Sequence, residues 1–157
     1  MNRNRENRIY WNRGWTFFEE YTPALCEKET AGFPEGTEVE LPHTAAVTPL
    51  HYFDESIYQK HCAYRKCFVP GKDWEGKRIF LNIEAAGHSA RVYLNGILLT
   101  EHFCGYTAFQ AELTAGIRQE MENVLLIEVD SRESQDLPPF GRAIDYMTFG
   151  GLYREVY

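Results

Sequence analysis

The chain has 157 residues, of which 44% are hydrophobic and 25% charged, and its formal net charge is −7. This length and composition fit a single globular domain over residues 1–157 that buries a core of its own. The negative charge argues against nucleic acid as a partner, and no apolar run is long enough to cross a membrane as a helix.

Residues 1–11 start with MNRNRENRIY, where arginines are interleaved with Asn and Glu and no apolar signal-peptide stretch occurs. We expect a loose N-terminal arm there and, without a secretory signal, a cytoplasmic protein with reduced thiols. The four cysteines form no C-x-x-C pair. His61, Cys62 and Cys67 lack a second ligand pair at a zinc-site spacing, so we expect no bound metal.

Strand-like segments separated by turn residues follow one another along the first half of the chain. At 78–84, Ile79, Leu81 and Ile83 occupy alternate positions between polar residues, which is typical of a half-buried strand. Shorter strands are expected before it at 15–18, 39–41 and 64–69.

The second half continues with a hairpin. Ala90, Val92 and Leu94 alternate with more polar residues, and Asn95-Gly96 follows them. Asn-Gly favours a type I′ turn because both central residues need a positive φ, so 97–100 is expected to be the returning strand. Further strands are expected at 109–113, 124–130 and 152–157.

Eight or more short strands predict an all-β fold, an antiparallel β-sandwich of the jelly-roll type. Helical periodicity is weak and allows at most a turn or two near 72–76 or 115–121. The strand pattern breaks over 42–61 and 131–149, both of which contain proline. Loops of this length in a small domain usually bind or dock against something.

The sequence contains none of the short motifs that mark a complete catalytic or cofactor site. G-x-S-x-G, H-E-x-x-H, the P-loop and G-x-G-x-x-G are all absent. His61 and Cys62 are neighbours in a strand and point to opposite faces, which prevents a Cys–His pair. A retaining glycosidase needs two carboxylates about 5 Å apart, but nothing here singles out such a pair. We expect no catalytic residue and no cofactor within this chain.

Two segments resemble a known family. Residues 89–109 read SARVYLNGILLTEHFCGYTAF, and residues 145–157 read DYMTFGGLYREVY. They resemble the N-terminal sugar-binding domain of glycoside hydrolase family 2, which holds β-galactosidases, β-glucuronidases and β-mannosidases. That domain typically has an A-x-V-Y-L-N-G hairpin, an H-x-G-G-Y-T-P-F segment and a closing G-G-I/L-Y-R-D-V strand.

Weaker matches precede these segments in the family's order, so that the resemblance covers about residues 12–157. Cys104 and Ala108 replace a Gly and a Pro of the pattern, and Thr44 replaces the Asp of an L-P-H-D turn, whose role cannot be carried over. Gly150-Gly151 is expected to let the chain re-enter the sandwich where a side chain would collide. The weaker matches are at 12–17, 41–43, 64–70 and 74–77.

The resemblance implies that this domain packs on a catalytic TIM barrel absent from the chain and lends a loop to its active-site rim. In β-galactosidases of the family, an Asp six residues before the second Gly of the closing motif contacts sugar hydroxyls, and here that position is Asp145. We therefore expect Asp145 to bind a galactoside in the full enzyme, alongside later domains, and the isolated domain to be inactive. The segment DYMTFGGLYREV favours β-galactosidase over β-glucuronidase.

The remaining motif positions carry no sugar role. Lys60 aligns poorly with an Asn that many β-galactosidases use, His102 and Tyr106 are interpreted as a structural histidine and a core tyrosine, and Arg154 is expected to pair with a carboxylate or face a neighbouring domain. Because the chain stops on a strand at Tyr157, we expect it to be part of something larger. A free-standing carbohydrate-binding module and a purely structural packing domain stay open as alternatives.

Overall fold

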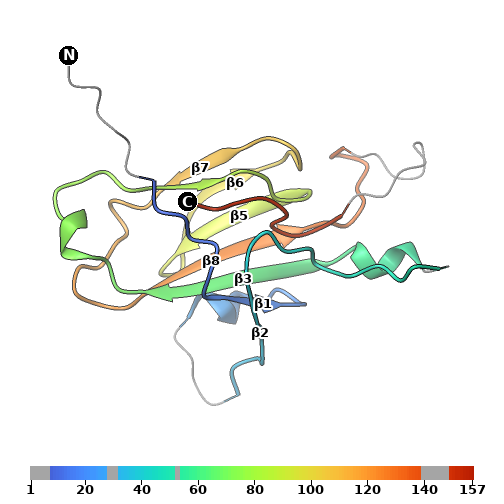
Figure 1. Ribbon diagram of the computed structural model, residues 1–157, viewed down its shortest axis with the longest axis horizontal. Helices are drawn as coiled ribbons and strands as arrows, with labels where there is room; N and C mark the ends of the chain where they lie inside the picture. The colour runs from blue at the N-terminus through green and yellow to red at the C-terminus, as the bar shows by residue number, and fades with distance from the viewer. Residues whose placement is uncertain (1–7, 28–31, 52–53, 139–148) are drawn as a thin grey trace.

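Strands make up most of the regular structure in the computed structural model, which describes residues 8–27, 32–51, 54–138 and 149–157 (Figure 1). The strands of the described part are β1 Trp15–Phe18, β2 Thr37–Val39, β3 His61–Phe68, β4 Phe80–Ile83, β5 Ser89–Leu94, β6 Ile97–His102, β7 Phe109–Glu112 and β8 Asn123–Asp130. Three short 3-10 helices accompany them, η1 Pro23–Cys26, η2 Glu55–Tyr58 and η3 Lys72–Trp74.

The strands form two antiparallel layers. The larger sheet has the order β2-β1-β3-β8-β5-β6, and the smaller one pairs β4 with β7. The C-terminal residues extend the smaller sheet, because Asn82 and Tyr157 exchange backbone hydrogen bonds of 2.8 and 3.0 Å. This arrangement confirms the expected antiparallel β-sandwich.

The core lies between the two layers and comes from alternate residues of each strand. Leu81 and Ile83 of β4 are 2% and 0% exposed, and Val92 and Leu94 of β5 are fully buried, as their alternation predicts. Trp15 of β1 is fully buried against them. The core side of β8 contributes Leu125, Ile127 and Val129.

The other face of the larger sheet carries a second, smaller hydrophobic cluster. Leu126 of β8 packs there with Phe18, Leu25 and Ala63. Leu25 belongs to η1, which lies beside β8 and covers this face. Central strands are therefore buried on both sides, which a simple alternation of one inward and one outward face does not predict.

The β5–β6 hairpin turns at Asn95 and Gly96, whose φ angles are +52° and +82°, as the Asn-Gly pair predicts. Elsewhere the element bounds differ from expectation. β2 ends at Val39 rather than reaching 41, because the backbone N–H of Leu41 donates to the Asn12 carbonyl at 2.7 Å and Pro42 has no N–H to donate.

The expected closing strand 152–157 appears as two separate bridges, Gly151 to Gly87 and Val156 to Ile83. Of the expected arm 1–11, residues 1–7 lie outside the described part. Trp11 packs against Phe68 and Trp74. No helix in the described residues is long and apolar enough to cross a membrane.

Candidate functional site

Several connecting segments meet at one end of the sandwich, and we call this end the loop rim. It comprises residues 42–51, η2, 84–88, 103–108 and the two described ends of the long loop, 131–138 and 149–151. Figure 1 shows η2 and 131–138 at the same end of the molecule. Asp145, the expected sugar-binding residue, lies outside the described residues.

Gly150 and Gly151 form the point where the long loop returns to the sandwich. A side chain at Gly150 would collide with Ser131, and one at Gly151 would lie 2.6 Å from Tyr64 Oη. Gly151 also has a φ of +103°, which L-residues rarely adopt. The Gly150 carbonyl accepts a 2.9 Å hydrogen bond from the Ala45 N–H. The expected need for two glycines here is confirmed.

Ser131 fixes the point where the same loop leaves β8. Its Oγ donates to the Tyr58 carbonyl at 2.7 Å and accepts from the Lys60 N–H at 3.0 Å. Its own N–H donates to the Lys60 carbonyl at 2.9 Å. The segment 132–149 is thus anchored at both ends, to neighbouring atoms of the rim.

Beside Ser131, Asp130 and Arg132 form a two-point ion pair with N–O distances of 2.9 and 2.6 Å. Partial burial opposes ionisation of Asp130, but the hydrogen bonds from Arg132 outweigh it and lower the pKa of that carboxyl. Asp130 therefore stays ionised and engaged with Arg132, and it is poorly suited to act as a general acid.

His43 and Tyr64 lie next to Gly151, where the long loop returns to the sandwich. His43 Nδ1 lies 2.9 Å from Tyr64 Oη, and the His43 N–H donates to the Leu152 carbonyl at 2.8 Å. The imidazole also packs on Phe17, with ring centroids 4.8 Å apart. Burial lowers the pKa of His43 and raises that of Tyr64. Both groups are therefore neutral near pH 7, and they serve as a hydrogen-bonded support.

The turn between β6 and β7 forms another part of the rim. His102 stacks on Phe109 at 4.3 Å and its Nε2 lies 2.9 Å from Thr107 Oγ1, so its structural interpretation is confirmed. The core interpretation of Tyr106 is wrong, because this turn projects the side chain outward and leaves it 53% exposed. The Tyr153 hydroxyl donates to the Gly105 carbonyl and ties the turn to the C-terminal segment.

The cysteines and histidines do not combine into a nucleophilic site in the described part of the chain. Cys62 points into the core, and burial raises the pKa of its thiol to about 12. Its neighbour His61 lies on the opposite face, 2.8 Å from Glu128. Hydrogen bonding from Thr107 lowers the pKa of Cys104. No group of three His, Cys, Asp or Glu side chains suited to a metal ion occurs among these described residues.

Two further positions from the sequence analysis are accounted for. Lys60 Nζ donates to Glu19 at 2.7 Å, so this side chain is engaged in an ion pair. Arg154 is exposed and lies over the Tyr153 ring, 5.8 Å from its centroid. The described part of the rim therefore consists of hydrogen-bonded backbone at Ser131 and Gly150 and of the neutral pair His43 and Tyr64 beside it.

Known proteins similar in sequence to this chain are glycosidases, although no family model matches it. The β-galactosidase of Thermoanaerobacter pseudethanolicus is 42% identical over 120 residues, which are 76% of this chain and 16% of that protein. The β-galactosidase of Thermoanaerobacterium thermosulfurigenes is 37% identical over 146 residues, 92% of this chain and 20% of that protein. The chain thus spans a fifth or less of the length of these curated relatives.

Solved structures similar to this chain also include glycosidases. A calcium-binding mutant of Bacteroides uniformis β-glucuronidase 2 matches 94% of this chain and 17% of its own, with 31% identity and a TM-score of 0.81. The β-glucuronidase of Bifidobacterium dentium matches 98% of this chain and 30% of its own, with a TM-score of 0.79. At 22% identity, the second likeness concerns the fold alone.

Proposed function

Since the chain is one domain of a larger glycoside hydrolase, in the family of β-galactosidases and β-glucuronidases, we propose that it is the sugar-binding domain of a family 2 β-galactosidase. Catalysis itself takes place on a TIM-barrel domain elsewhere in the full protein, by the retaining two-carboxylate scheme. The present domain packs beside that barrel and brings its loop rim to the edge of the active site.

One observation of the fold carries this proposal: the anchoring of segment 132–149 at both of its ends. Ser131 holds the outgoing end through three hydrogen bonds with η2 and Lys60, and Gly150-Gly151 holds the returning end. A binding residue needs such support, because a side chain on an unrestrained loop loses conformational entropy when it meets its ligand. Asp145 lies within this anchored segment.

In this proposal the Asp145 carboxylate accepts hydrogen bonds from vicinal hydroxyls of the galactose ring. Hydrogen bonds to an ionised acceptor are stronger than those between neutral groups. The preference for a galactoside over a glucuronide is supported by sequence, since two β-galactosidase relatives reach 42% and 37% identity, whereas a Bacteroides fragilis β-glucuronidase reaches 32% over 94 residues.

The test is Asp145→Ala in the full-length enzyme, with nitrophenyl β-galactoside as substrate. Loss of a charged hydrogen bond of about 1.5–3 kcal/mol predicts a fall in kcat/KM of about tenfold to a hundredfold. Asp136→Ala is the matched control, because Asp136 is an exposed aspartate in the same loop whose side chain is not at the motif position. We expect its kcat/KM to stay within about twofold of the parent.

Equal kinetics for Asp145→Ala and the parent enzyme would reject the sugar contact and favour a purely structural domain. An equal loss in both variants would assign the effect to the loop as a whole. Thermal unfolding of each variant separates a lost contact from a lost fold.

A further inference from the structure

Residues 150–152, which we call the return segment, are held in place by three backbone N–H groups from two neighbouring parts of the loop rim. These groups donate to three consecutive carbonyls of the segment. The pairs are His43 to Leu152 at 2.8 Å, Ala45 to Gly150 at 2.9 Å and Gly87 to Gly151 at 3.1 Å. The three donor amides therefore report directly whether the return segment is seated on the sandwich.

His43 contacts the return segment with its backbone and the core with its ring. A Cβ at Gly151 would lie 2.8 Å from the His43 carbonyl oxygen and 2.6 Å from Tyr64 Oη. The imidazole Nδ1 lies 2.9 Å from the same Oη, and the ring packs on Phe17 with centroids 4.8 Å apart. Moving the ring of His43 out of this site therefore disturbs the backbone contacts that seat the return segment.

The groups that face the imidazole are uncharged. It packs against β1 through Phe17 and against β3 through Tyr64, while its backbone binds the return segment. The titratable groups on this side of β3 are the Tyr64 hydroxyl and the Cys62 thiol, and burial raises the pKa of both. In the described part of the chain, no carboxylate pairs with the ring of His43.

Protonation changes what this site can accommodate. A neutral imidazole can accept a hydrogen bond from the Tyr64 hydroxyl at Nδ1, whereas an imidazolium has a donor on both nitrogens and no acceptor. Its charge would also lie half-buried against Phe17 and Tyr64 without a counter-ion, which costs free energy that contact with water relieves. The charged form of His43 therefore favours an arrangement in which residues 43–45 have moved out toward solvent.

We propose that His43 is a pH switch of the loop rim, whose protonation opens the contact between residues 43–45 and the return segment while the sandwich stays folded. The opening releases the backbone hydrogen bonds of the return segment and leaves the Ser131 end of the same loop in place. The inference concerns contacts between described residues and does not depend on Asp145. Its failure can therefore be told apart from failure of the proposed function.

The test is hydrogen exchange of single amides in the full-length protein at pH 7.5 and 5.5, read by mass spectrometry with fragmentation. Protection factors are compared, because they remove the intrinsic pH dependence of exchange. Opening exposes His43 at its ordinary pKa of about 6.5, so the open fraction can rise by at most about tenfold over this range. We expect the protection factors of the His43, Ala45 and Gly87 amides to fall several-fold.

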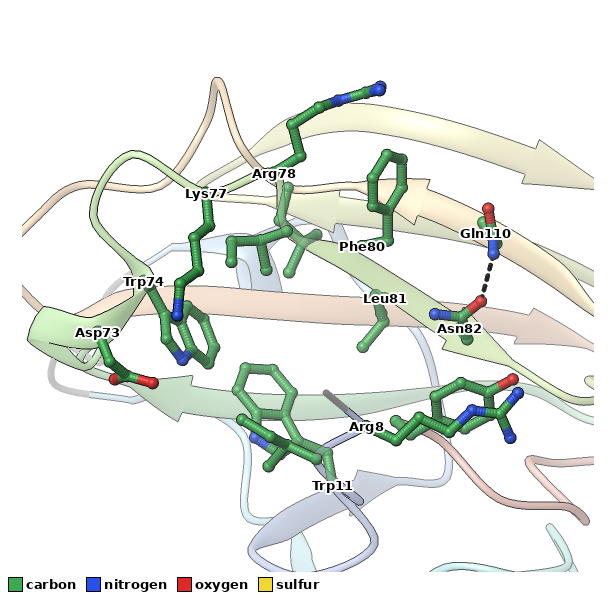
Figure 2. Close-up of a pocket in the computed structure, with 14 residues that line it drawn as sticks. Arg8, Trp11, Asp73, Trp74, Lys77, Arg78, Phe80, Leu81, Asn82 and Gln110 are labelled. Atoms are coloured by element: carbon green, nitrogen blue, oxygen red, sulfur yellow. Dashed lines mark hydrogen bonds between the residues drawn. The ribbon is translucent and has the colours of Figure 1, made fainter. Parts of the chain in front are cut away.

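Two reference amides separate local opening from general loosening. The Ser131 amide donates to the Lys60 carbonyl at 2.9 Å, at the other end of the long loop. The Asn82 amide belongs to β4, and Figure 2 shows its side chain beside the cleft of the smaller sheet, bonded to Gln110. We expect the protection factors of both reference amides to change by less than about twofold.

His43→Asn removes the titrating group but keeps a polar side chain that can reach Tyr64, and His43→Gln repeats the test with a longer amide side chain. In both variants the protection factors of the Ala45 and Gly87 amides should no longer depend on pH. His51→Asn is the matched control, because the side chain of His51 is exposed. It should show the same fall as the parent protein.

Three results would overturn the proposal. The first is protection at Ala45 and Gly87 that does not change with pH in the parent protein. The second is a parent-like fall in His43→Asn and His43→Gln, which would assign the opening to another titratable group. The third is an equal fall at the reference amides of Ser131 and Asn82, which would show that acid loosens the whole domain.

Discussion

At the scale of single residues, the backbone conformation and the close neighbours of position 151 require glycine. Its φ of +103° is strained for any L-residue, and a Cβ there would lie 2.8 Å from backbone atoms of His43 and Ala45. We expect Gly151→Ala to lower the free energy of unfolding by about 3 kcal/mol or more. Urea unfolding followed by fluorescence measures it.

Gly76→Ala is the control, because it introduces backbone strain without a steric collision of the added Cβ. Its φ is +71°, and an added Cβ would have no atom within 4 Å. Gly76→Ala should therefore lower the free energy of unfolding by about 1–2 kcal/mol, the cost of the left-handed conformation alone. Equal losses in the two variants would show that the collision at Gly151 adds nothing to the loss in free energy of unfolding.

His43 gives the protein a stability that depends on pH. Burial lowers the pKa of the folded imidazole below its ordinary value of about 6.5, so on acidification the unfolded chain takes up a proton before the folded one does. The free energy of unfolding should thus fall as pH drops from about 6.5 toward the folded pKa. Thermal melts at pH 7.5 and 5.5 measure the change.

His43→Asn should show a smaller loss of melting temperature between these two pH values than the parent protein. The control is His51→Asn, since the side chain of His51 is exposed. We expect the control to behave as the parent does. A parent-like pH dependence in His43→Asn would contradict this assignment.

Sequence alone predicts some residues of the rim and misses others. The requirement for Gly150-Gly151 is visible because glycine pairs mark close approach. The role of Ser131 is not visible, since its partners Tyr58 and Lys60 are more than 70 residues away in the chain. The sugar contact of Asp145 stays a prediction.

At the scale of elements, β8 and its neighbours form a buried polar cluster around Glu128, which is 3% exposed. The carboxylate accepts hydrogen bonds from Arg91 at 3.0 Å and from the Tyr93 hydroxyl at 2.8 Å, and lies 2.8 Å from His61 Nε2. Glu128→Ala would remove the carboxylate that contacts Tyr93 and His61, and it would leave Arg91 with Glu101 alone. We expect it to lower the free energy of unfolding by about 3–5 kcal/mol.

The matched control removes the exposed partner of the same arginine. Glu101 binds Arg91 at 2.6 Å, but both side chains are about two-fifths exposed. Glu101→Ala should lower the free energy of unfolding by at most about 1 kcal/mol. If urea unfolding shows equal losses for Glu101→Ala and Glu128→Ala, the cluster does not stabilise the sheet.

Strand positions follow from alternation only where one face is buried. That condition holds for β4 and β5, whose inward residues were predicted correctly. In β8, Leu126 and Glu128 alternate as an outward face would, yet both are buried because η1 and β5 cover them. The helix η1 was not predicted, because it is held by tertiary packing of Leu25 and lacks helical periodicity of its own.

At the scale of the whole molecule, the number of short strands and the turn residues between them predict the sandwich, and the structure confirms it. Sequence does not predict how the second layer is completed. The C-terminal residues pair with β4 through isolated bridges, a contact between segments about 70 residues apart. The cytoplasmic location also stays a prediction.

We propose that this domain serves a galactosidase whose catalytic groups lie elsewhere in the full protein. The most direct measurement compares the full-length protein with residues 1–157 alone, on nitrophenyl β-galactoside and nitrophenyl β-glucuronide. We predict that the full-length protein hydrolyses the galactoside in preference to the glucuronide and that residues 1–157, folded by circular dichroism, hydrolyse neither. Turnover by residues 1–157 alone, or a full-length protein without glycosidase activity, would contradict the claim.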